Sequence, residues 1–168
     1  MRKITLLAIV LMSTIFTIQA QKIGHMNSGN LLAEMPETGR ADSVLVIYQK
    51  QLAMKGDTLA KAFESEYKAF MGANNAGTLS KAQAQKRQEA LQKQQQYLQG
   101  YSQDMEQKVG ILRKQLLQPI LGRLDAAIQN VGKEGKYEFI LDTSSGSALF
   151  ANETFDVTAL VKQKLNLK

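Results

Sequence analysis

Apolar residues recur every three or four positions through the second half of the chain. They are Leu91, Leu98, Tyr101, Met105, Val109, Leu112, Leu116, Ile120, Leu124, Ile128 and Val131. The mean step is close to the ~3.6-residue repeat of an α-helix, so these side chains form one continuous stripe. Together with residues 79–90, the stripe predicts a helix over about 79–131, which at ~1.5 Å per residue would be roughly 80 Å long. A helix of that length exceeds the width of a compact domain, so part of it must form an arm.

A second stripe precedes the first and predicts its partner. Apolar residues at helical spacing run from Ala41 to Met71, and residues 72–78 (GANNAGT) between the stripes are rich in Gly and Asn. These residue types adopt turn conformations and end helices. We therefore expect an antiparallel helical hairpin with its tip near Asn75. The segment 110–131 overshoots the partner helix, must pack on something else, and is expected to kink at Pro119.

The two ends of the chain predict short strands and helices. Residues 22–27 (KIGHMN) are a strand candidate. Asn27 or Ser28 can cap a brief helix that runs to Glu34 and stops before Pro36.

The C-terminal segment predicts a β-hairpin followed by a last helix. Residues 136–142 alternate as a strand should, Ser144–Gly146 supply a turn, and residues 147–152 (SALFAN) form the return strand. Asp156 is placed to cap a helix over residues 157–165.

A sheet of three short strands has open edges, and strands from other subunits are its natural cover. We therefore expect a mainly α fold with a small β body: an oligomerisation body of residues 21–40 and 111–168 carries a helical hairpin arm of residues 41–110. The body residues expected to join subunits are Ile23, Met26, Phe139, Ile140, Leu141, Leu149, Phe150 and Val161.

The first twenty residues predict export. Arg2 and Lys3 precede an apolar run from Leu6 to Ile18, a secretory signal peptide with cleavage expected near Ala20. Removing these two basic residues leaves 19 basic against 15 acidic ones, a net charge of +4 that is too small to indicate nucleic acid. The chain has no cysteine, so packing or oligomerisation must stabilise it in place of disulfides.

The order of elements resembles the Skp/OmpH family of periplasmic chaperones. The segments that carry the resemblance are 22–37 (KIGHMNSGNLLAEMPE), 116–131 (LLQPILGRLDAAIQNV) and 137–165 (YEFILDTSSGSALFANETFDVTALVKQKL). The resemblance implies a homotrimer in which terminal segments form an intersubunit β-barrel and three helical hairpins enclose a central cavity. It also implies a periplasmic holdase that binds unfolded outer-membrane β-barrel proteins without ATP and prevents their aggregation before membrane insertion.

Two residues attract attention as candidates for catalysis. Asp142 lies in the stretch FILDTSSGSALF, which is similar to the catalytic turn of an aspartic protease. Such enzymes need a second carboxylate in a matching motif, and a glycine normally follows Asp-Thr, where this chain has Ser144. His25 is the only histidine and has no metal-ligand spacing around it. We expect no enzyme activity, metal or cofactor, and expect Asp142 to accept backbone N–H groups of its turn.

The hairpin carries the candidate binding residues. Ten of the 25 residues from 83 to 107 are Gln, and residues 78–123 hold eight basic and three acidic residues. A purely structural interpretation is that the polar residues form a solvated helix face and the apolar ones pack between the two helices. The functional interpretation is that the arm offers a hydrated surface that binds unfolded client proteins through many weak contacts. The candidates are Phe63, Tyr67, Phe70, Met71, Lys86, Arg87, Lys93, Tyr97 and Tyr101. The local charge would also favour anionic lipid or lipopolysaccharide.

A second hypothesis from another class stays open. Long helical arms also suit a structural coiled-coil protein of the cell envelope, in which the arms act as spacers or as a scaffold. Suppression of client aggregation separates the two, since a spacer has no reason to bind unfolded chains.

Overall fold

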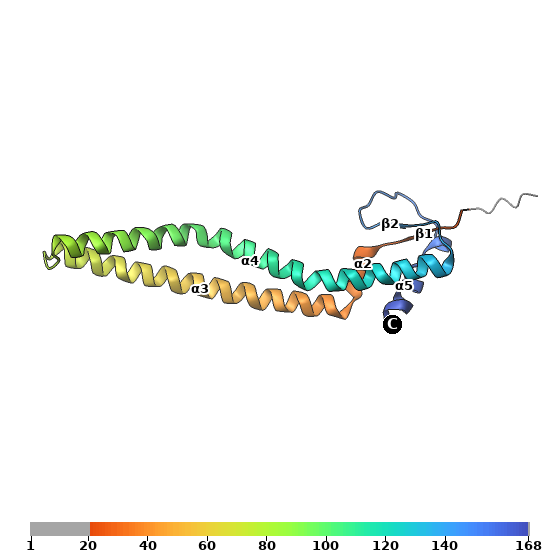
Figure 1. The fold of residues 1–168 in the computed structure, drawn as a ribbon, viewed down its shortest axis with the longest axis horizontal. Coiled ribbons are helices and arrows are strands. Elements are labelled where there is room, and N and C mark those ends of the chain that lie inside the picture. Colours follow the sequence, from red (N-terminus) through yellow and green to blue (C-terminus); the bar gives the residue numbers. More distant parts are fainter. Residues whose placement is uncertain (1–20, 168) are drawn as a thin grey trace, which may run out of the picture. The chain divides into compact units, whose positions relative to one another are not determined.

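The computed structural model describes residues 21–167, so the predicted signal peptide lies outside the described residues. This described part of the chain is mostly helical with one small sheet (Figure 1). The elements, in order, are β1 (Ile23–Met26), α2 (Ser28–Glu34), α3 (Pro36–Asn75), α4 (Lys81–Gly135), β2 (Phe139–Asp142), the 3-10 helix η1 (Glu153–Phe155) and α5 (Thr158–Leu165). Two compact units result: a hairpin unit, Gly29–Asp125, and an end unit made of residues 21–28 together with residues 126–167.

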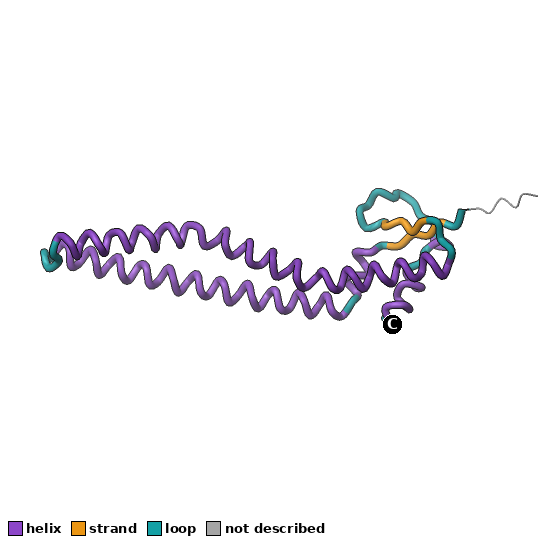
Figure 2. Tube along the Cα trace, viewed as in Figure 1, coloured by secondary structure: helices purple, strands orange, loops and turns teal. Residues whose placement is uncertain are grey.

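The hairpin unit confirms the predicted pair of long helices. Helix α3 and the greater part of α4 run antiparallel and side by side (Figures 1 and 2). Helix α3 begins earlier than predicted, at Pro36, where a proline costs nothing because the first N–H groups of a helix have no intrahelical partner. The hairpin unit is therefore longer than the predicted arm of 41–110, and α4 beyond residue 110 keeps a partner. Ile120, Leu124 and the ion pair of Arg123 with Glu37 continue the hairpin there.

The tip of the hairpin lies where Gly and Asn predicted it. Helix α3 ends at Asn75, and Gly77 follows with φ of +67°, a conformation that glycine adopts without strain. Ser80 then caps α4 reciprocally: its hydroxyl accepts the Gln83 N–H, and the Gln83 side chain accepts the Ser80 N–H at 3.0 Å. This capping box moves the start of α4 from the expected residue 79 to Lys81.

The seam between α3 and α4 is a row of buried apolar side chains. Its members include Ala41, Leu45, Leu52, Leu91, Tyr101, Ile120 and Leu124. Tyr101 packs against Gly56, where a Cβ would lie only 2.9 Å from the Tyr101 ring, and its hydroxyl donates to the Leu52 carbonyl at 2.8 Å. At this contact the packing of α4 on α3 therefore depends on the fit of the Tyr101 ring against Gly56 as well as on the burial of apolar surface.

The end unit is built on a parallel pair of strands. Strand β1 pairs with β2 in the register Ile23 to Phe139 and Met26 to Asp142, and the two lie side by side in Figure 2. Gly24 allows close packing here, because a Cβ would meet Val157 at 2.8 Å. The core of this unit consists of Met26, Ala127, Val131, Val157, Val161 and Leu165.

The predicted β-hairpin at residues 136–152 is wrong for the single chain. Strand β2 forms, but residues 147–152 are not a strand, and β2 pairs with β1 instead. The intervening loop turns at Gly146, with φ of +71°, and leads to Asn152, whose side chain caps η1. Leu149 and Phe150 remain exposed because no strand of the described chain lies beside them. The connection from β1 to β2 instead runs through both long helices, as a parallel pair requires a long crossover.

Helix α5 confirms the last predicted helix. It begins at Thr158, whose N–H donates to the Asp156 carboxylate at 2.7 Å. Among residues 21–167, no helix has the length and apolar character needed to cross a bilayer.

Candidate functional site

Asp142, the candidate catalytic residue, has a structural environment. One carboxylate oxygen accepts the backbone N–H groups of Ser144 at 2.9 Å and of Ser28 at 3.1 Å, and the other accepts the hydroxyls of both serines. Partial burial would raise the pKa of this carboxyl, but the hydrogen bonds from Ser28 and Ser144 outweigh it and lower the pKa to about 2. Asp142 therefore ties the end of β2 to the start of α2 and to the following turn.

His25 also serves the fold of the end unit. Its Nε2 lies 2.9 Å from the carbonyl oxygen of Asn152, and its own carbonyl accepts the Val157 N–H. Burial would raise the pKa of the nearby Asp156 carboxyl, but hydrogen bonds from Thr158 and the charge of His25 lower it. In the described part of the chain, no group of three His, Cys, Asp or Glu side chains is placed to hold a metal.

The predicted aromatic candidates of the hairpin divide into seam and surface. Tyr67, Met71 and Tyr97 are exposed, whereas Phe63 and Phe70 are half-buried. Phe63 stacks on Tyr67 along the same helix, with ring centroids 6.1 Å apart.

Tyr101 requires a correction. Only 7% of its surface is exposed, so it cannot offer an open contact to a bound chain. The reason is Gly56 on the opposite helix, which leaves room for the ring inside the seam.

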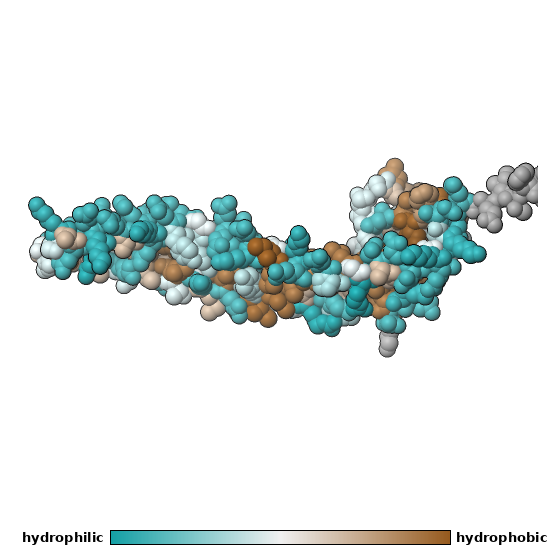
Figure 3. All heavy atoms as spheres, viewed as in Figure 1, coloured by the Kyte–Doolittle hydropathy of each residue, from teal (hydrophilic) through white to brown (hydrophobic). Residues whose placement is uncertain are grey.

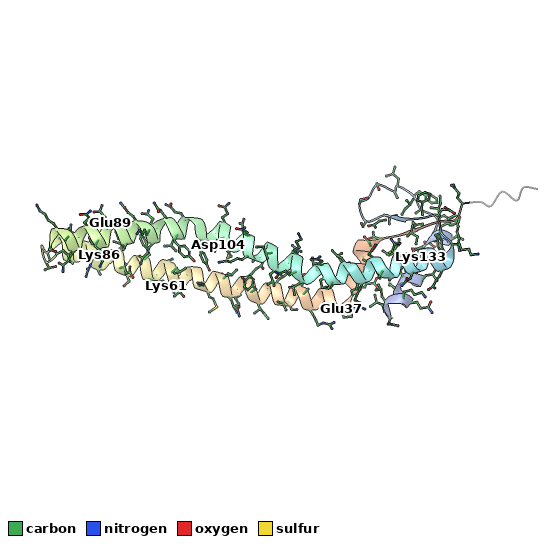
Figure 4. The ribbon with its side chains drawn as sticks, in the orientation of Figure 1. Glu37, Lys61, Lys86, Glu89, Asp104 and Lys133 are labelled. Carbon is green, nitrogen blue, oxygen red and sulfur yellow. The ribbon has the colours of Figure 1, made fainter. Side chains whose placement is uncertain are left out.

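The basic candidates lie on the surface. Lys86, Arg87 and Lys93 are all exposed, and none forms an ion pair with another residue of the described chain. Lys86 and Glu89 lie near the tip of the hairpin (Figure 4). The structure therefore leaves these cations available to a partner, and it does not gather them into one closed site.

Exposed apolar side chains also lie farther from the tip, at positions that the sequence pattern did not single out as binding candidates. They are Val44, Val46, Ile47, Met54, Ile111 and Leu121, between 44% and 63% exposed. Apolar patches interrupt the hydrophilic surface of the hairpin in Figure 3. The sequence does contain a sign of this exposure, because residues 44–48 (VLVIY) and 116–117 are apolar at consecutive positions. Consecutive residues of a helix point ~100° apart, so a single buried face cannot cover all of them.

The end unit exposes a second apolar surface beside its sheet. Phe139, Leu141, Leu149 and Phe150 are more than half exposed, Leu149 completely. A groove of about 580 Å³ includes two of these side chains, Leu141 and Phe150, in its lining, together with Ile23 and Phe155. Exposed apolar surface next to a strand edge is typical of a subunit interface.

Not all of the predicted body residues share this exposure. Ile140 is half-buried, while Met26 and Val161 are buried to 1% and 0% exposure within their own chain. These two cannot touch another subunit directly, and their role is to hold β1 and α5 in the unit's core.

Together these features define a class of protein: a long two-helix hairpin combined with a small α/β end unit, both with exposed apolar surface. Comparison with known proteins narrows this class. The sequence profile of the OmpH family, described as outer membrane protein (OmpH-like), matches residues 22–165. The chain belongs to the OmpH family.

A solved structure shares the fold. A Caulobacter crescentus CB15 protein, described as an OmpH-like outer membrane chaperone, superposes with a TM-score of 0.71 and is 19% identical, over 88% of this chain and 85% of that one. Identity this low shows a common fold and no more. No curated protein matches this chain in sequence.

Proposed function

We propose that this protein is an ATP-independent periplasmic holdase that encloses unfolded outer-membrane proteins between helical arms and prevents their aggregation before insertion. The observation that carries the proposal is the set of exposed apolar side chains on the hairpin: Val44, Val46, Ile47, Met54, Ile111 and Leu121. A folded helical pair gains nothing from leaving such side chains in water, whereas a protein that binds unfolded chains needs them. Membership of the OmpH family and a fold shared with an OmpH-like chaperone support it.

The proposed assembly is a homotrimer joined through the end units. Strand β2 and the loop that carries Leu149 and Phe150 would meet their counterparts in neighbouring subunits and close an intersubunit β-barrel. The groove of about 580 Å³ and the exposed side chains around it support this arrangement. Three hairpins would then surround a central cavity.

The proposed client contacts include the exposed candidates near the tip. Met71 is 39% exposed and Tyr97 48%, and methionine adapts to many partner shapes. Lys86, Arg87 and Lys93 would attract acidic clients, or anionic lipid and lipopolysaccharide, and so affect encounter more than affinity. No bond is made or broken in this mechanism, and no cofactor is required.

Suppression of aggregation tests the proposal. A porin unfolded in urea is diluted into buffer with and without the purified protein, and light scattering records aggregation. A holdase suppresses scattering near stoichiometric ratios, whereas a spacer or scaffold leaves it unchanged, and that outcome would refute the proposal.

Variants of the same assay locate the contacts. The pair Met71→Ser and Tyr97→Ser is expected to weaken suppression, with Ser102→Ala, an exposed position of α4, as the control. Raising NaCl from about 50 mM to about 500 mM is expected to slow capture, because salt screens exposed charges. Equal capture at both concentrations would remove the electrostatic contribution from the mechanism.

A further inference from the structure

A shallow groove follows one face of α4 in the hairpin unit. It has a volume of about 490 Å³, and its lining residues are Gly110, Arg113, Lys114, Leu117, Gln118 and Leu121. Steps of three, one, three, one and three residues keep all six on a single helix face. Gly110 provides the hollow: a Cβ built there would meet nothing within 4 Å.

The groove carries positive charge that the protein itself does not neutralise. Lys108 pairs with Asp104, and Arg123 pairs with Glu37, but Arg113 and Lys114 form no ion pair with any residue from 21 to 167. Residues 107–124 contain no Asp or Glu. A ligand that brings carboxylates would therefore meet an unopposed pair of cations.

Apolar side chains occupy the other end of the same groove. Leu121 is 48% exposed, Leu117 is half-buried, and Ile111, 52% exposed, lies on the adjoining row of the helix. Gln118 lies between the cations and Leu121, and its side chain is exposed. An amide side chain offers both a donor and an acceptor, which is the complement of a peptide group.

We propose that this groove binds extended polypeptide segments in which a carboxylate side chain is followed, about three residues later, by apolar side chains. The cations and Leu121 are seven or eight residues apart, roughly 11 Å along a helix, which an extended chain spans in about three residues. A lipid acyl chain fits this groove less well than a peptide does. The groove is open to solvent, and the amide of Gln118 would face hydrocarbon without a hydrogen-bond partner. The inference rests on the proposed function, since the segments in question belong to unfolded clients.

Peptide binding to the purified protein tests the groove directly. The probe is a fluorescein-labelled, amidated peptide, Glu-Glu-Thr-Val-Leu-Val-Thr-Val-Leu, compared with the same peptide carrying Gln in place of both Glu. Fluorescence anisotropy is expected to show that the Glu peptide binds about fourfold more tightly, which is the scale of solvent-exposed ion pairs.

Two variants and matched controls locate the binding. Arg113→Gln with Lys114→Gln should bring the two peptides to equal affinity. Lys55→Gln with Lys61→Gln makes the same charge change at two exposed positions of α3 and should leave the preference in place. Gly110→Leu fills the hollow and should weaken both peptides about tenfold. Gly100→Leu is its control, because Gly100 also has open space around it on α4. Circular dichroism verifies that helix content is retained.

Each alternative result has a defined meaning. The proposed binding site is overturned if the double variant of Arg113 and Lys114 still prefers the Glu peptide. It is also overturned if the Gly110→Leu variant binds both peptides as tightly as the parent protein does. Loss of binding to phosphatidylglycerol vesicles in the double variant, with peptide preference intact, makes lipid the occupant and also overturns it.

The two proposals can fail separately. Suppression of porin aggregation without peptide binding would reject the groove and retain the holdase. The expected peptide results together with unsuppressed aggregation would reject the holdase and retain the groove as a binding site.

Discussion

At the scale of single residues, Asp142 shows how a motif can be structural. A strand that ends in Asp-Thr-Ser is similar to a catalytic turn, yet all four hydrogen bonds of this carboxylate come from Ser28 and Ser144. Backbone N–H groups from two segments far apart in sequence converge on it. These four hydrogen bonds explain why an acidic residue suits position 142, because a carboxylate can accept several hydrogen bonds from N–H and O–H groups at once.

Asp142→Asn is expected to lower stability without abolishing client binding. The pKa of the carboxyl is about 2 in the folded protein against an ordinary value of 3.8, so its contribution is fully present above about pH 4 and is lost as the pH falls towards 2. Because the side chain is only slightly buried and solvent screens its interactions, we expect a loss on the order of 1 kcal/mol at pH 7. Urea unfolding at several pH values measures it, and the difference between variant and parent should shrink below pH 4.

The control for this prediction is Asp57→Asn, which changes an exposed carboxylate on α3. A difference between Asp142→Asn and the parent that stays constant down to about pH 2 would contradict the assigned role.

At the scale of elements, one glycine allows the closest contact that Tyr101 of α4 makes with α3. Gly56 lies inside α3, where alanine would ordinarily favour the helix by ~1 kcal/mol. Here the added methyl would lie 2.9 Å from the Tyr101 ring, which is held by its hydrogen bond to Leu52. At this position helix propensity therefore favours alanine, whereas packing against Tyr101 favours glycine.

Gly56→Ala is expected to destabilise the hairpin by about 1–3 kcal/mol, since overpacking displaces the ring or separates the helices. Gly39→Ala, in the same helix with nothing within 4 Å of the new methyl, should instead leave stability unchanged or raise it by up to ~1 kcal/mol. Urea midpoints of the two variants measure the contrast. Equal effects of the two substitutions would show that Tyr101 does not constrain the seam.

At the scale of the whole molecule, the exposed apolar surface of the end unit is the feature that a single chain leaves unexplained. Leu149 is fully exposed and Phe150 is 85% exposed, on a loop beside the open edge of β2. A monomer would gain from polar residues at both positions. The proposed trimer would bury them against neighbouring subunits.

Leu149→Asp and Phe150→Asp are each expected to convert the oligomer to monomers without unfolding the chain. In the single chain these side chains contact water, so a charge costs little there, but in a buried interface it costs several kcal/mol. Multi-angle light scattering gives the mass, and circular dichroism verifies the helices. Ser145→Asp, in the same loop, is the control; an oligomer that survives both apolar changes would exclude this surface as the interface.

Several elements followed from the sequence by itself. Periodic apolar residues over 91–131 and 41–71 predicted both long helices, because a helix that buries one face must repeat every ~3.6 residues. Gly and Asn at 72–78 placed the tip, and the short helices at both ends began near the residues expected to cap them. These features depend on interactions between residues that are close in sequence, so the local sequence pattern is enough to predict them.

Only the tertiary structure decided the rest. Strand β2 pairs with β1, more than a hundred residues away, and not with the adjacent residues 147–152, because the crossover through α3 and α4 brings the distant strand beside it. Tyr101 belongs to the seam because Gly56 faces it, and Val44, Ile47 and Ile111 are exposed because each helix has one neighbour in the hairpin and two apolar faces. The apolar pattern alone therefore determined which segments are helical, while the pairing of those segments determined which side chains remain free to bind.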